Sequence, residues 1–220
     1  MERAAFLARL RQGLQQPAPV GHAAHHIEPY SGVAAAAYRR PLSDLAAAFT
    51  EEAEALGARV RRVRPGGLPA FLAEVVAEHG IRRAVVSRDP ETAGAPSHLE
   101  ALGVAVSPWD GPAAAAGADL GLTGAAFGIA ATGSVVVAAD RAGGRSASLL
   151  PPVHAALVPV GSLLATPADL WRDLGRRFPN GLASQVVVIT GPSRTGDIEL
   201  VLVRGVHGPG HVWVGLLEEA

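Results

Sequence analysis

The chain has 220 residues, 49% of them hydrophobic, and a formal net charge of −1, so it can bury one large core and lacks the basic excess of a nucleic-acid-binding protein. It contains no cysteine and no lysine, which excludes thiolate-bound iron–sulfur clusters, disulfides, thiol nucleophiles, Walker-A phosphate loops and lysine Schiff bases. No run of about 18 uncharged apolar residues would span a membrane, and the N-terminus lacks the apolar core of a signal peptide, so we expect a cytoplasmic protein.

The first 41 residues predict a short helix followed by an irregular arm. Apolar residues recur at helical spacing over 3–14, and prolines and glycines interrupt 15–41. The arm carries His22, His25 and His26. We expect no metal there, because a flexible His-rich segment rarely builds closed coordination without a packed second shell.

Residues 42–220 predict a single α/β domain. Helices and strands alternate up to residue 107, a pattern typical of a largely parallel sheet with helices on its faces. The predicted helices are 42–56, from 68 to Gly80, 95–102 and one starting at Thr166, whose buried side is expected to hold Leu170, Trp171 and Leu174. The predicted strands are 58–63, 83–87, 104–107, 120–123, 127–131, 134–139, 153–160, 185–190 and 211–217. The fold class is therefore α/β, with a mixed, largely parallel sheet flanked by helices.

A glycine-containing loop, GPSRTGDIE at residues 191–199, is the first candidate site. It follows an apolar strand directly, and ligands of open α/β sheets lie beyond the carboxyl ends of the strands. Its polar side chains could bind an anion and transfer a proton. They are Ser193, Arg194, Thr195, Asp197 and Glu199. The alternative is a tight turn in which Arg194 forms an ion pair with Asp197 or Glu199.

Two further loops are candidates. His207 stands in GVHGP, where glycine and proline stiffen the turn, and it suits a general acid or base; a turn histidine bonded to backbone is the alternative. The turn Thr132-Gly133-Ser134 offers two hydroxyls and backbone N–H groups to an anion, and an ordinary hairpin is the alternative.

Together these segments resemble the LUD-domain family, in particular its single-domain members of the lactate-utilisation protein C (LutC) type. The resemblance rests on LTG at 122–124, IAATGS at 129–134, the stretch from Arg145 to His154, GPSRTGDIE at 191–199 and GVHGP at 205–209. Ala131 departs from the pattern, because family members usually carry an acidic residue there, and Gly196 stands where alanine is frequent.

The resemblance implies a place in a bacterial system for growth on L-lactate, beside one protein with iron–sulfur motifs and another with cysteine-rich repeats. It implies no cofactor in this chain, with iron–sulfur clusters only on those partners. It also implies a fold similar to the class of ribose-5-phosphate isomerase, glucosamine-6-phosphate deaminase and CoA transferases, which binds small anionic or phosphorylated ligands near strand ends.

Two functions follow as hypotheses. In the first, the chain is an accessory, non-redox protein of lactate oxidation that binds a small anionic ligand, its iron–sulfur partner proteins, or both. Arg194 would anchor a small carboxylate, residues 132–134, 193 and 195 would supply hydrogen bonds to it, and His207 would transfer a proton. No side chain of the sequence accepts electrons, so a partner or cofactor would do so. In the second, the chain is a stand-alone enzyme of the isomerase or CoA-transferase class, with Asp197 or Glu199 as base or nucleophile and Arg194 on a phosphate.

Overall fold

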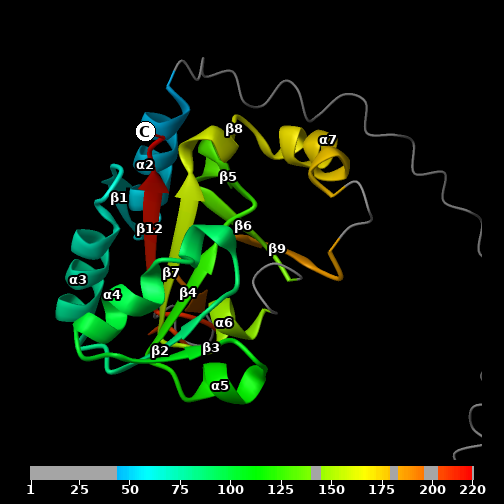
Figure 1. The fold of residues 1–220 in the computed structure, drawn as a ribbon. Coiled ribbons are helices and arrows are strands. Elements are labelled where there is room, and N and C mark those ends of the chain that lie inside the picture. The colour runs from blue at the N-terminus through cyan, green and yellow to red at the C-terminus, as the bar shows by residue number, and fades with distance from the viewer. Residues whose placement is uncertain (1–43, 140–144, 179–182, 196–202, 220) are drawn as a thin grey trace, which may run out of the picture. The chain divides into compact units, whose positions relative to one another are not determined.

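The computed structural model describes residues 44–139, 145–178, 183–195 and 203–219 (Figure 1). The predicted N-terminal helix and arm over 1–41, with His22, His25 and His26, lie outside the described residues. In the described part of the chain, no helix is both long and apolar enough to cross a membrane.

A six-stranded, fully parallel sheet forms the centre of the domain, in the order β1-β12-β7-β4-β2-β3. The last strand of the chain, β12, pairs with β1 on one side and β7 on the other. Its predicted bounds are confirmed, and the largely parallel arrangement is confirmed with them. The strands are β1 (Arg59–Val63), β2 (Arg83–Val86), β3 (Ala105–Pro108), β4 (Leu120–Gly124), β7 (Val153–Pro159) and β12 (His211–Leu217).

Helices cover both faces of this sheet, as the alternation of patterns predicted. On one face, α3 (Leu68–His79) and α4 (Ala95–Ala101) bury Phe71, Leu72 and Leu99 against apolar side chains of the strands. On the other face lie α2 (Leu45–Ala55), α5 (Pro112–Ala116) and α6 (Ser146–Leu149). Gly80 ends α3 in the left-handed conformation, with φ 60°, as its place after the apolar pattern predicted.

The mixed character of the fold comes from a second sheet, with the order β8-β5-β6-β9. Its β5 and β6 are antiparallel, β6 and β9 are antiparallel, and β5 and β8 are parallel. The strands are β5 (Phe127–Ile129), β6 (Ser134–Ala138), β8 (Leu163–Leu164) and β9 (Val186–Ile189), and a separate short hairpin joins β10 (Arg194–Thr195) to β11 (Val203–Arg204).

Helix α7 (Pro167–Arg177) packs beside the second sheet and begins where the sequence predicted. The backbone N–H of Thr166 donates to the Asp169 carboxylate over 2.9 Å, the arrangement of a capping box. Leu170 and Leu174 are buried, but the prediction for Trp171 was wrong, because its side chain is 70% exposed. Leu170 and Leu174 are four residues apart and share one helix face, whereas Trp171 is rotated about 100° from Leu170.

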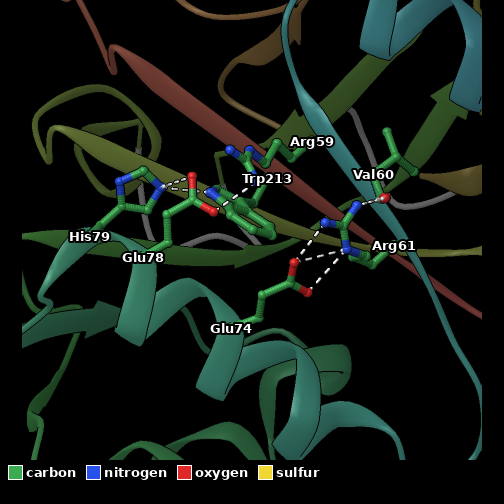
Figure 2. A network of polar contacts seen from close by, with 7 residues as sticks. All are labelled: Arg59, Val60, Arg61, Glu74, Glu78, His79 and Trp213. Atoms are coloured by element: carbon green, nitrogen blue, oxygen red, sulfur yellow. Dashed lines mark hydrogen bonds and ion pairs between the residues drawn. The ribbon is translucent and has the colours of Figure 1, made fainter.

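A network of side chains attaches α3 to β1 and β12, two neighbouring strands of the parallel sheet (Figure 2). Arg61 of β1 donates to both carboxylate oxygens of Glu74, and the Trp213 indole N–H donates to His79 Nε2 over 2.8 Å. Burial, assisted by the neighbouring His211, lowers the pKa of His79, which agrees with an unprotonated Nε2 that accepts from Trp213. The network therefore holds the C-terminal end of α3 over β12.

One polar pair lies deep in the core. His154 of β7 is 0% exposed, and its Nε2 lies 2.9 Å from the hydroxyl of Thr123 on β4. Its Nδ1 is buried and finds no hydrogen-bond partner among the described residues. Burial lowers the pKa of His154 to about 4, because a charged imidazole would lose its hydration there.

We predict that His154 makes the stability of the protein depend on pH between about 6.5 and 4. As the pH falls, the unfolded chain takes up the proton first, since its histidine pKa is about 6.5, so the folded state loses about 2–3 kcal/mol by pH 4.5. Urea unfolding at pH 7 and 4.5 should show this loss in the wild type and a smaller loss in His154→Gln. His98→Gln, on α4, is the control, and equal pH dependence in all three proteins would contradict the prediction.

Candidate functional site

A cavity of about 450 Å³ lies at the amino end of β12 and brings together two loops that the sequence singled out. The loop after β9 forms one wall, and the loop before β12 forms another. The short helix α6 and the end of α2 complete the lining. The lining residues are Leu56, Ser148, Leu149, Val187, Val188, Ile189, Thr190, Gly191, Pro192, Ser193, Arg194, His207, Gly208, Pro209 and Val212.

Backbone hydrogen bonds hold the two loops together. The N–H of Ser193 donates to the carbonyl of Pro209 over 2.9 Å, and the N–H of Gly205 donates to the carbonyl of Ser193 over 3.1 Å. A Cβ at Gly208 would lie 3.4 Å from Cβ of Ser193, so the chains are in close contact at this point. His207 is thereby placed on the same cavity as Ser193 and Arg194.

Arg194 is positioned by the turn between α2 and β1. Its guanidinium donates to the carbonyl of Leu56 at the C-terminal end of α2. The next residue, Gly57, has φ +90°, and a Cβ there would lie 2.8 Å from the terminal Nη2 of Arg194. The positive φ therefore favours glycine at position 57, and a side chain there would also displace the end of Arg194.

The turn Thr132-Gly133-Ser134 lies outside the lining of this cavity. It packs on α2, and Ser134 is 1% exposed; none of the three residues lines this cavity. Their hydroxyls instead form a chain toward it: Thr132 Oγ1 lies 2.6 Å from Ser134 Oγ, which lies 2.8 Å from Thr190 Oγ1. Thr190 does line the cavity. Sequence reasoning did not select Thr190, although its place between an apolar strand and Gly-Pro was a usable signal.

The first candidate loop follows a strand of the second sheet, and the cavity it lines lies at the amino end of a strand of the parallel sheet. The first candidate loop was expected beyond the carboxyl end of a strand of the parallel sheet, but β9 belongs to the second sheet. The cavity reaches Val212, at the beginning of β12, so it lies at the amino end of that strand. Thr195 is on β10 and does not line the cavity. Asp197 and Glu199 lie outside the described residues.

The described residues contain no group of three or more His, Asp or Glu side chains placed to hold a metal ion. The cavity instead combines one guanidinium, three hydroxyls and one imidazole with an apolar wall. Such a set suits an anion that accepts hydrogen bonds and, through His207, exchanges a proton. The hydroxyls come from Ser148, Thr190 and Ser193.

Comparison with known proteins confirms the family that the sequence motifs indicated. A LUD domain model matches residues 46–217. Lactate utilization protein C of Halalkalibacterium halodurans is 32% identical over 171 residues, 73% of this chain and 74% of that protein. The protein of the same name from Bacillus subtilis is 38% identical over 94 residues, 42% of this chain and 39% of that protein. The chain therefore belongs to the LUD-domain family.

A solved structure confirms the fold. The crystal structure of a DUF162 family protein from Deinococcus radiodurans matches with a TM-score of 0.60 and covers 82% of this chain and 99% of that one. The two sequences are 21% identical, so this likeness concerns the α/β architecture alone.

We predict that Gly133→Ala destabilises the protein far more than Gly80→Ala. Both glycines have φ near +60°, so both variants carry the same left-handed cost of about 1–2 kcal/mol. A Cβ at Gly133 would lie 2.3 Å from the backbone nitrogen of Ala53, whereas a Cβ at Gly80 would meet nothing within 4 Å. Urea unfolding should show an additional loss of roughly 2 kcal/mol or more for Gly133→Ala. Equal losses would show that the turn is not tightly packed on α2.

Proposed function

We propose that this protein is an accessory, non-redox component of bacterial L-lactate utilisation that binds a small anionic ligand in the cavity at the amino end of β12. The family and the names of its relatives support the pathway. The observation that carries the ligand site is the meeting of Arg194, Ser193 and His207 on one cavity.

Each of these side chains has a distinct role in the proposal. Arg194 attracts the anion and donates hydrogen bonds to it, because its guanidinium has five N–H groups and only part of that capacity is used at Leu56. Ser193 and Thr190 donate hydroxyl hydrogen bonds, and the buried Ser134 orients the hydroxyl of Thr190. His207 transfers a proton if the ligand reacts here.

The electrons of lactate oxidation would pass through other proteins. Neither cysteine thiolates nor any other electron-accepting side chain occur in this sequence. The iron–sulfur clusters would therefore lie on partner proteins of the same system, one with iron–sulfur motifs and one rich in cysteine. This chain would supply the anion site or a docking surface to that assembly.

We predict that L-lactate or pyruvate raises the thermal unfolding midpoint of the purified protein, because a ligand that binds only the folded state stabilises it once its concentration exceeds Kd. Arg194→Gln should remove most of this shift, and Arg64→Gln, at an 88% exposed side chain just after the carboxyl end of β1 and outside the cavity, should leave it unchanged. The panel also contains inorganic phosphate, ribose-5-phosphate and acetyl-CoA.

The outcomes separate the two functional classes. Stabilisation by the carboxylates that depends on Arg194 supports the anion site in the lactate pathway. Stabilisation by ribose-5-phosphate or acetyl-CoA, followed by turnover of that compound, would favour the stand-alone isomerase or transferase. No shift with any compound would contradict a ligand site in the isolated chain.

A further inference from the structure

A second cavity, of about 600 Å³, lies beside α6 and outside the proposed anion site. The segment between β3 and α5 supplies Trp109 to its lining, and α6 with its flanking residues supplies Arg145 and Leu150. The chain that enters β9 completes the wall. Among the described lining residues, Leu149 is the only one shared with the first cavity. The second cavity is therefore separate from the proposed anion site, although α6 borders both.

Arg145 is the one charged residue among the described residues of this lining. Its side chain is exposed, and its guanidinium forms no ion pair with a described carboxylate. Arg145 supports α6 through its backbone instead, because its carbonyl accepts from both the N–H and the hydroxyl of Ser148 over 3.1 Å. The guanidinium is therefore available to an anionic ligand.

Large apolar side chains line the same cavity. Leu149 and Leu150, at the end of α6, are 36% and 50% exposed. Trp109 also lines it, and its indole N–H donates to the hydroxyl of Ser146 over 2.7 Å. That bond satisfies the one polar group of the indole and holds the ring at the residue that follows Arg145. The cavity thus combines one positive charge with apolar and aromatic surface.

These features define the chemical class of a ligand. A volume of about 600 Å³ lies in the range of roughly 300–1,000 Å³ that is typical of sites for organic ligands larger than a three-carbon acid. A single guanidinium matches one carboxylate, which its planar fork binds through two hydrogen bonds. Exposed leucine and indole surface favours an apolar group on the rest of the ligand.

We infer that this second cavity binds an organic monocarboxylate with a bulky apolar body, with the carboxylate on Arg145 and the body against Trp109 and Leu150. The inference does not depend on the proposed function, because a different cavity and a different arginine carry it.

Isothermal titration of the full chain with three matched probes tests the inference. Phenylacetate carries both groups, acetate carries the carboxylate alone, and 2-phenylethanol carries the ring with a neutral head group. Phenylacetate should bind at least about tenfold more tightly than either of the others, because it alone engages the guanidinium and the apolar wall together. Equal affinities for phenylacetate and 2-phenylethanol, or for phenylacetate and acetate, would overturn the inference.

Two variants with matched controls locate the groups. Arg145→Gln should weaken phenylacetate about tenfold and leave 2-phenylethanol within about twofold, because glutamine removes the charge and keeps the backbone carbonyl; Arg64→Gln, outside this cavity, should change neither. Leu150→Ala should weaken phenylacetate and 2-phenylethanol by a similar factor of roughly three to ten. Leu102→Ala is its control, since Leu102 is 42% exposed at the end of α4 and does not line the cavity.

Arg194→Gln distinguishes this inference from the proposed function. Phenylacetate binding that persists in Arg194→Gln and is weakened in Arg145→Gln supports the second cavity. Binding that is lost in Arg194→Gln and unchanged in Arg145→Gln would place phenylacetate in the first cavity and overturn the inference. Absence of phenylacetate binding to the wild type would also overturn it and leave the proposed function standing, since lactate and pyruvate test that function separately.

Discussion

The pairing of β12 between β1 and β7 is the constraint on which the rest of the structure depends. The last strand of the chain fills an interior position of the parallel sheet, and residues 212–216 are all buried. Without β12, the edges of β1 and β7 would lack partners, so the domain completes its core only when the C-terminal segment is in place. The network from α3 to Trp213 then covers one face of this strand (Figure 2).

The same insertion creates the candidate site. Because β12 starts beside the amino ends of β1 and β7, the loop that precedes it lines the same cavity as the end of α2 and as α6. The loop after β9 arrives from the second sheet and is bonded to it through Ser193 and Pro209. Three parts of the chain that are distant in sequence therefore contribute to one cavity.

The second sheet contributes the support for this cavity. Gly133 lets the turn between β5 and β6 lie directly on the backbone of α2, and the adjacent Ser134 reaches Thr190. The Thr-Gly-Ser motif thus packs on α2, and its buried Ser134 links the hydroxyls of Thr132 and Thr190. A buried hydroxyl that is hydrogen-bonded on both sides fixes the orientation of its neighbours, which is what a preorganised ligand site requires.

The sequence by itself determined the fold class, most element positions and the two loops that meet at the cavity. Apolar periodicity located β12 and α3, and the caps at Gly80 and Thr166 marked helix ends, because these signals depend on neighbours in the chain. The glycine-rich motifs identified the family for the same reason. Exclusion of thiol and lysine chemistry followed from composition alone.

Only the tertiary structure decided which groups meet and which edge of the sheet holds them. The assignment of β9 to a second sheet, the placement of Arg204 opposite Arg194 and the role of Thr190 depend on contacts between segments far apart in sequence. The sequence also did not predict that Trp171 is exposed, because the position of Trp171 next to Leu170 does not show which face of the helix packs on the second sheet. Local patterns record the preference of a segment for helix, strand or turn, whereas strand order and side-chain convergence are set by how those segments pack together.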